Sequence, residues 1–167
     1  MITPDYCVTM ARYDQWQNDA LRDQVKVMSD ADLRQDRGAF FGSIFRTMNH
    51  ILWGDLLWLH RLDPSIEAPN LEVSHLEATT TPTEWAAERF RVDGIIREWA
   101  RRLKSIDLSG DIVWFSKFYQ KEFHHPKTLC ITHMFNHQTH HRGQIHAMLT
   151  AAGQKTIDTD LIFMLES

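Results

Sequence analysis

The most distinctive stretch of this chain is the segment from His133 to Gln144, which reads HMFNHQTHHRGQ. The segment lies inside a predicted helix, and residues four apart on a helix differ by about 40° in direction and about 6 Å in height. His137 and His141 can therefore converge on one metal ion, as the paired histidines of an HExxH motif do. His133 and His137 have the same spacing. His133 and His141, however, lie about 12 Å apart along the axis, too far for all three to bind one ion.

The helix face that carries these histidines is predicted to point inward. An HxxxH pair alone is weak evidence for a metal site, because such pairs also occur in ordinary helices. Here the same face carries Cys130, Met134, Gln144 and Met148. Imidazoles turned toward a core need polar partners, and a metal ion satisfies them better than hydrocarbon does. The sequence therefore favours a metal site that contains His137 and one of its two neighbours.

A third ligand has to come from another helix, and His50 is the favoured residue. It lies off the main apolar stripe of its helix, on a strip with Trp53, Gly54 and Leu57. A helix that is apolar on two sides is packed on two sides, as an inner helix or one at a subunit interface is. Taken alone, His50 has the ordinary alternative of a structural histidine with hydrogen-bond partners.

Hydrophobic periodicity and capping residues predict four long helices. Their expected limits are Thr3 to about Met28, Phe40 to Leu62, Thr81 to about Ser109, and Pro126–Thr128 to Ala152. A polar loop rich in proline and threonine spans residues 65–80, and residues 158–165 are expected to form one or two helical turns. A short irregular hairpin before the fourth helix is predicted from Val113, Phe115, Phe118 and Tyr119.

These elements predict an all-α fold, an up-down four-helix bundle with a short C-terminal helix and a small hairpin before the fourth helix. The 167 residues are 43% hydrophobic and 24% charged, the balance of an ordinary globular protein. No repeat or internal boundary is visible, so a single domain is expected over residues 1–167.

Composition narrows the expected partners and compartment. Lys and Arg total 18 against 22 Asp and Glu, so the net charge of -4 gives no electrostatic support for nucleic-acid binding. Two cysteines without a CxxC motif are too few for a disulfide framework. No signal-peptide pattern begins the chain, and no apolar stretch is long enough to span a bilayer. We therefore expect a cytoplasmic protein with neither nucleic acid nor a membrane as partner.

Two ExxH sequences, Glu72 to His75 and Glu122 to His125, match the half-site of di-iron carboxylate bundles. That site needs both motifs on regular helices and a glutamate from each of two more helices. Here the first motif falls in the polar loop and the second abuts Pro126, while the helix of residues 40–62 contains no glutamate. We reject a di-iron site.

Several segments carry a resemblance to a known family. They read ARYDQWQN (residues 11–18), GAFFGSI (38–44) leading into NHILWGD (49–55), NHQTHHRGQ (136–144) and IDTD (157–160). In these segments the chain resembles the DinB/YfiT-like family of small metalloenzymes. The histidine-rich segment is the most specific of them, and the resemblance covers nearly the whole chain.

The resemblance implies a four-helix bundle, commonly dimeric, with one divalent metal ion on three histidines. Carried over residue by residue, the ligands are His50 from the second helix and His137 and His141 from the fourth. His133 and His140 are then left as pocket residues beside the site. The family's metals include nickel and zinc. Some relatives are transferases or isomerases that use a low-molecular-weight thiol as cosubstrate.

We expect an enzyme acting on a small-molecule substrate, because three nitrogen ligands leave a coordination position open. Asn49, Asn136 and Gln144 are candidates for orienting an imidazole or a substrate, and equally for packing between helices. No general base adjoins a ligand as it does in HExxH, so the catalytic residues stay unassigned. The alternative is a non-catalytic stress protein in which the metal ion is structural or sensed.

A homodimer is also expected. Trp53, Leu57 and Trp58 lie beyond the main apolar stripe of the second helix. They offer more apolar surface than the core of a single bundle needs to cover.

Overall fold

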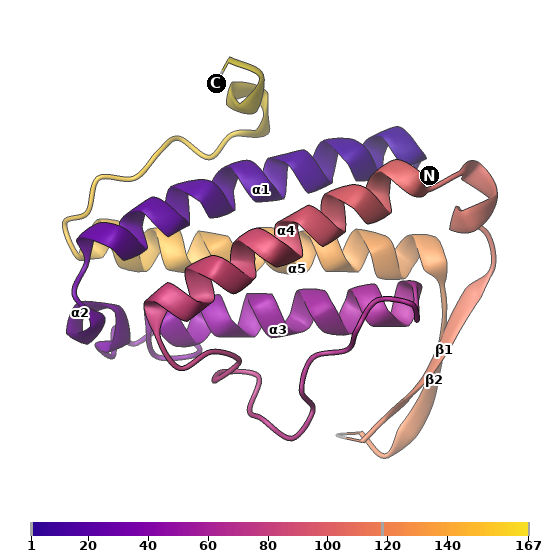
Figure 1. The fold of residues 1–167 in the computed structure, drawn as a ribbon, viewed down its shortest axis with the longest axis horizontal. Helices are drawn as coiled ribbons and strands as arrows, with labels where there is room; N and C mark the ends of the chain where they lie inside the picture. The colour runs from indigo at the N-terminus through magenta and orange to yellow at the C-terminus, as the bar shows by residue number, and fades with distance from the viewer. Residues whose placement is uncertain (1, 118, 167) are drawn as a thin grey trace.

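The fold is a bundle of four long helices that lie side by side: α1 (Pro4–Val27), α3 (Ile44–Leu62), α4 (Pro82–Arg102) and α5 (Lys127–Ala151) (Figure 1). The structure is a computed structural model that describes residues 2–117 and 119–166. A short helix, α2 (Asp30–Arg34), precedes α3, and two 3₁₀ helices follow α4 and α5: η1 (Ser105–Leu108) and η2 (Leu161–Glu166). The predicted helical bundle with a short C-terminal helical segment is confirmed.

The four helices do not simply alternate in direction. α1 runs antiparallel to α4, since Asn18 contacts Asp93 while the earlier residue Gln15 contacts the later residue Arg97. α3 and α4 run parallel, because the loop of residues 63–81 returns along the length of the bundle before α4 begins (Figure 1). The predicted up-down order therefore fails at this one connection. A short turn forces neighbouring helices to be antiparallel, whereas a long crossover does not.

Side-chain caps fix where the first three long helices begin. The hydroxyl oxygens of Thr3, Ser43 and Thr81 each accept a hydrogen bond from a backbone N–H three residues later, at 3.1, 3.2 and 3.1 Å. Gly153, with a φ of +75°, follows the end of α5, close to the predicted limit at Ala152. α4 ends at Arg102, before the predicted limit near residue 109, because the backbone becomes extended at the next residue.

α3 begins at Ile44, later than the predicted start at Phe40. Gly42 has a φ of +81°, a left-handed conformation that interrupts a right-handed helix. Phe41, which the periodicity assigns to the helix, instead lies against His50, with 4.3 Å between the ring centroids. The predicted helix therefore wrongly included Phe41, which lies before α3 and packs against His50.

The predicted hairpin is present between α4 and α5, as strands β1 (Asp111–Ser116) and β2 (Lys121–Pro126). The two strands pair antiparallel, with Trp114 opposite Phe123. Phe118, also assigned to the hairpin from the sequence, lies outside the described residues. The hairpin extends from the bundle and packs over the end of α3 (Figure 1).

The second apolar side of α3 is covered in part by the chain itself. Trp53 donates its indole N–H to the backbone oxygen of Asn70 at 3.2 Å and contacts His75. Trp58 packs edge-on against Trp114 of β1, with 5.4 Å between ring centroids. The homodimer prediction rests on these two tryptophans and on Leu57, and the loop and the hairpin already contact the tryptophans. The homodimer stays a prediction.

A row of charged side chains crosses the core of the bundle. Arg89 of α4 donates a hydrogen bond to Asp55 of α3 at 2.6 Å and forms an ion pair with Asp93 of α4 at 2.8 Å. Arg142 of α5 pairs with Asp14 of α1. All five side chains are buried, and each long helix contributes at least one of them. Ion pairs between helices thus stand among the apolar contacts of this core.

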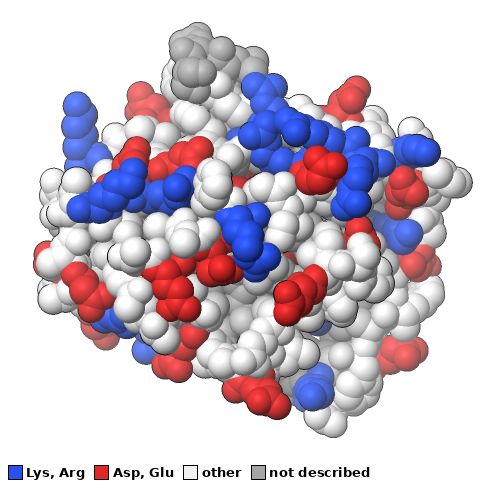
Figure 2. All heavy atoms as spheres, viewed as in Figure 1, with Lys and Arg blue, Asp and Glu red and all other residues white. Residues whose placement is uncertain are grey.

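Charges of both signs also cover the surface. On the face shown in Figure 2, acidic and basic side chains lie among one another. Exposed ion pairs one helical turn apart occur on α4, such as Arg91 with Glu88 at 2.8 Å. No helix in the described part of the chain combines the length and the apolar composition needed to cross a membrane.

Candidate metal centre

Three histidines from two helices meet in one cluster: His50 of α3 and His137 and His141 of α5. Each offers one ring nitrogen, and these nitrogens lie within 4.8 Å of one another. Because His137 and His141 are one helical turn apart on the same face of α5, His50 can meet both. The structure therefore brings together the three residues that the family resemblance implies as ligands.

Short contacts between polar atoms order the cluster. Nε2 of His50 lies 2.9 Å from Nε2 of His137, and Nδ1 of His50 lies 2.7 Å from Nδ1 of His75. A neutral imidazole carries one N–H, so it can donate in only one of two such contacts. Nδ1 of His141 lies 2.8 Å from Oε1 of Gln144. Since an amide oxygen only accepts, His141 holds its proton on Nδ1 and keeps Nε2 free as a ligand.

Burial keeps these imidazoles neutral. Burial, and then repulsion from neighbouring imidazoles, lowers the pKa of His50 and of His137 to about 3. Burial also lowers the pKa of His141, while its hydrogen bond to Gln144 acts in the opposite direction. At neutral pH the free ring nitrogens therefore carry lone pairs, the form in which imidazole binds a metal ion.

The donor set and its surroundings fit a divalent metal ion. Imidazole nitrogens are good ligands for zinc and nickel. Nδ1 of His137 is buried and has no hydrogen-bond partner among the described residues, so Nε2 carries the polar contact of this ring. A metal ion at Nε2 would offset the cost of burying an imidazole that makes so few polar contacts.

Gly54 gives the His137 ring its space. A Cβ atom at Gly54 would lie 3.0 Å from Cε1 and 3.5 Å from Nδ1 of His137. Gly54→Ala is therefore expected to displace the ring and to weaken metal binding roughly 10- to 100-fold, the scale on which groups that orient metal ligands act. Calorimetric titration of metal-free protein with zinc or nickel measures the change.

Gly143→Ala is the matched control for this prediction. Gly143 lies on α5 two residues after His141, and a Cβ atom there would meet nothing within 4 Å. Glycine to alanine inside a helix raises helix propensity by about 1 kcal/mol, so both variants are expected to keep the helical circular dichroism spectrum. Equal metal affinity in the two variants would show that the space beside His137 has no part in the site.

Of the remaining predicted pocket residues, Gln144, His140 and His133 lie close to the cluster. Nε2 of Gln144 lies 3.3 Å from Nε2 of His140, and the ring of His140 is 4.8 Å from that of His141 between centroids. His133 lies one turn further along α5, with 5.6 Å between its ring centroid and that of His137.

The two asparagines do not reach the cluster. The side-chain oxygen of buried Asn49 accepts hydrogen bonds from the backbone N–H and the hydroxyl of Thr79, at 2.7 and 2.8 Å. Of the two roles considered for Asn49, orienting a ligand or packing between elements, these contacts support packing. Asn136 is exposed, and no hydrogen bond in the described part of the chain joins it to a histidine. Each precedes a cluster histidine, and one residue turns a helix by about 100°, away from the ligand's face.

Two residues beside the cluster were not predicted there, His75 and Phe41. His75 comes from the loop between α3 and α4 and meets Nδ1 of His50. The ring of Phe41 packs on His50 and His141, at 4.3 and 5.3 Å between centroids. A loop histidine has no periodic spacing that could reveal its partner. Its occurrence in an ExxH sequence was a signal only for a di-iron site.

No carboxylate belongs to the histidine cluster within the described ranges. Asp55, the nearest acidic residue on α3, points away from the cluster and pairs with Arg89 at 2.6 Å, as helix geometry predicts. Glu122 of the second ExxH sequence lies on β2 and not on a helix. Both placements agree with the rejection of a di-iron site.

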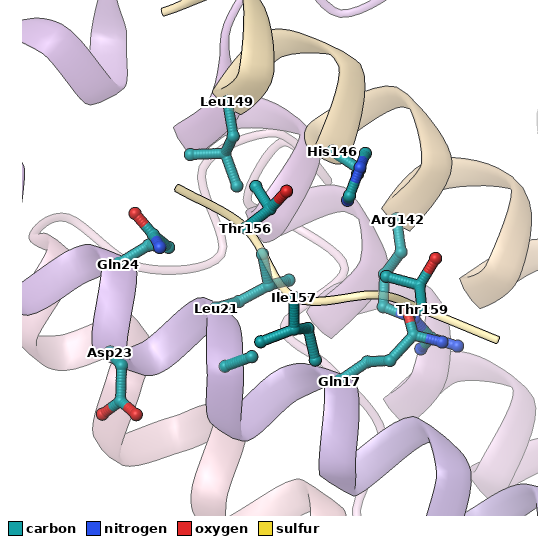
Figure 3. Close-up of a pocket in the computed structure, with 11 residues that line it drawn as sticks. Gln17, Leu21, Asp23, Gln24, Arg142, His146, Leu149, Thr156, Ile157 and Thr159 are labelled. Atoms are coloured by element: carbon teal, nitrogen blue, oxygen red, sulfur yellow. The ribbon is translucent and has the colours of Figure 1, made fainter. Parts of the chain in front are cut away.

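Another hollow lies away from the histidine cluster, under the segment that follows α5 (Figure 3). Residues around it include Leu21, Gln24, His146, Leu149 and Ile157. The segment is held across α1 by hydrogen bonds from Tyr13 to Thr159 and from Gln24 to Lys155, at 2.6 and 2.7 Å. The hollow's volume is about 140 Å³, below the roughly 300–1,000 Å³ of small-molecule sites. We therefore regard it as a packing gap.

Comparison with known proteins identifies the family and supports the fold. The DinB family matches the chain over residues 1–167. No curated protein matches it in sequence. Among solved structures the chain is similar to the crystal structure of a DinB-like protein from Bacillus cereus ATCC 10987. The TM-score is 0.62 at 19% identity, covering 86% of this chain and 91% of that chain, which supports the helical fold. Since the family match covers the full length of the sequence, the chain belongs to the DinB family.

Proposed function

We propose that this chain is a metal-dependent enzyme that holds one divalent ion on His50, His137 and His141. The observation that carries the proposal is the meeting of three ring nitrogens within 4.8 Å of one another. Structural zinc sites are usually closed by four protein ligands, whereas three ligands leave a position for water or substrate. Nickel or zinc suits this nitrogen donor set.

The chain's own residues prepare the site for chemistry. Gln144 holds the proton of His141 on Nδ1, and His75 restrains the ring of His50 through its Nδ1. The ring of Phe41 packs against His50 and His141 on one side of the cluster. The ion, when bound, supplies a Lewis acid that lowers the pKa of a bound water or stabilises a thiolate at neutral pH. We favour a transferase or isomerase reaction on a small-molecule substrate.

The chain's cysteines support an external thiol as cosubstrate. Cys7 and Cys130 are free and buried. Burial raises the pKa of both thiols, that of Cys7 to about 11, so neither supplies a thiolate at neutral pH. A low-molecular-weight thiol would have to supply it. Free cysteines also support a reducing compartment such as the cytoplasm.

Metal analysis and a reaction screen test the proposal. Elemental analysis of protein purified without an affinity tag is expected to find one nickel or zinc ion per chain. The metal-loaded protein is then screened with pairs of a thiol and an electrophile. Turnover that requires both the metal and a thiol supports the proposal, and protein purified without any divalent metal contradicts it.

Removing the metal is expected to abolish activity and to leave the fold largely intact. The helices are capped by Thr3, Ser43 and Thr81, and the core of buried apolar side chains, which includes Trp85 and Phe135, contains none of the three histidines. A ligand at 100 times its Kd adds only about 2.7 kcal/mol to the stability of the native state. Far-UV circular dichroism and the thermal midpoint of chelator-treated protein measure the effect, and readdition of the metal controls for damage.

The opposite outcome would replace the enzyme proposal. Wholesale loss of helicity in the metal-free protein at room temperature would mean that the binding free energy of the ion is part of the folding free energy. The ion would then be structural or sensed, as in the non-catalytic alternative.

A further inference from the structure

An aromatic cleft adjoins the histidine cluster, between the hairpin and helices α3 and α5. Its volume is about 440 Å³, within the roughly 300–1,000 Å³ of small-molecule sites. The residues around it include Trp58, Arg61, Trp114, Phe123, Leu129 and His133. Helix α3 and the later, consecutive hairpin and α5 thus form one concave surface.

The cleft has flat aromatic walls. Trp114 stacks on Phe123, with 5.4 Å between ring centroids and 13° between the ring planes. Trp58 meets Trp114 edge-on, at 5.4 Å and 79°. The ring of His133 lies 4.8 Å from that of Trp58. Walls of this kind favour a flat apolar guest, through stacking and edge-to-face contacts.

The positively charged guanidinium of Arg61 lies against the rings of Trp58 and Trp114, and no carboxylate pairs with it among the described residues. Its guanidinium carbon lies 4.7 Å from the ring centre of Trp58 and 4.8 Å from that of Trp114. Burial lowers the pKa of Arg61, the neighbouring Cys130 thiol acts in the opposite direction, and no carboxylate of the described residues forms an ion pair with Arg61. A desolvated guanidinium is best stabilised by a carboxylate, which it binds through two parallel hydrogen bonds.

The cleft lies next to the candidate metal centre. His133 borders the cleft, and its ring centroid is 5.6 Å from that of His137. On α3, Arg61 follows His50 by eleven residues, about 16 Å along the helix axis. An elongated small molecule anchored at Arg61 can therefore extend toward the histidine cluster.

We propose that the substrate binds in this cleft and is a flat, aromatic or conjugated carboxylate. The carboxylate pairs with Arg61, and the flat body lies against Trp58 and Trp114. The term substrate rests on the proposed function, because the reaction is assigned to the histidine cluster. The chemical class of the ligand follows from the cleft alone, and its binding does not require the metal ion.

Cinnamate and its neutral amide, cinnamamide, are suitable probes, because they share a flat conjugated body and differ in charge. Calorimetric titration is carried out with metal-loaded and metal-free protein, and NMR follows the indole N–H signals of Trp58 and Trp114. Cinnamate is expected to bind saturably, to shift both indole signals and to bind at least ten-fold more tightly than cinnamamide. Arg61→Met, which keeps an unbranched apolar stem, is expected to lose this preference. Arg12→Met, at an exposed position on α1, is expected to retain it.

Three results would overturn the proposal. One is binding that does not depend on the charge pair with Arg61, seen as equal affinity for acid and amide or as an unchanged affinity for cinnamate in Arg61→Met. Another is the absence of saturable binding at millimolar concentration. The third is a dimer in light scattering that Trp58→Ala dissociates, because a second copy of the chain would then occupy the cleft. The proposed function can fail separately from this proposal. If the protein binds no divalent metal but still binds cinnamate through Arg61, the ligand class is supported and the metal-dependent reaction is contradicted.

Discussion

His137→Ala is expected to abolish metal binding. His137 supplies the ring nitrogen that lies 2.9 Å from Nε2 of His50, and it comes one turn before His141 on α5. The loss should exceed the roughly 10- to 100-fold that follows removal of a group behind a metal ligand, because a direct ligand is removed. Metal content after purification and calorimetric titration of the metal-free variant measure the loss. His50→Ala and His141→Ala are expected to behave in the same way.

His133→Ala is the control for this result. It removes another histidine of the same helix face, but one whose ring packs on Trp58 in the neighbouring cleft. It is expected to keep the metal ion. If His133→Ala empties the site while His141→Ala does not, the ligands are the other i,i+4 pair and our assignment is wrong.

Arg89→Met is expected to lower the free energy of unfolding by about 3–5 kcal/mol, the usual cost of removing one partner of a buried ion pair. Arg89 is buried and pairs with Asp55 and Asp93, so its loss leaves two buried carboxylates without a cation. Urea denaturation followed by circular dichroism measures the change. The control is Arg91→Met on the same helix, whose exposed ion pair with Glu88 is worth at most about 1 kcal/mol.

The loss in Arg89→Met should depend on pH. Burial raises the pKa of Asp55 and of Asp93 even with Arg89 present, and removing Arg89 raises both further. A carboxyl whose pKa is higher in the folded state favours folding below its unfolded pKa, near 4, and loses that contribution as the pH rises through its folded pKa. The deficit of the variant is therefore expected to be larger at pH 8 than at pH 5. A deficit under about 1 kcal/mol at both pH values would contradict a stabilising role of Arg89.

Much of the helical architecture follows from local signals in the sequence. Thr3 and Thr81, each followed by proline, mark helix starts, and Gly153 marks a helix end, because caps depend on residues within one turn. The start of α3 was missed, since the apolar residues Phe40 and Phe41 continue the helical periodicity across Gly42. The parallel direction of α3 and α4 was also missed, because a loop of this length permits either direction.

Only the part of the candidate metal centre whose residues are close in the sequence could be predicted from spacing. His137 and His141 share a helix face through their spacing, and Gln144 lies one turn further on the same face. His50 needed the additional argument of a helix with two apolar sides, and the family resemblance to choose it. The pocket roles considered for Asn49 and Asn136 had no support from helix geometry, since each lies about 100° from its neighbouring histidine.

The sequence by itself determined the four long helices, the N-caps Thr3 and Thr81, the hairpin and the histidine pair on α5, because each of these depends on spacing within a few residues. Only the tertiary structure decided which distant groups meet. It placed His75 and Phe41 against the cluster, and it set Arg61 of α3 beside Trp114 of the hairpin. Such contacts depend on how helices and loops pack together, and one buried charge or loop histidine in a sequence carries no periodic signal that names its partner.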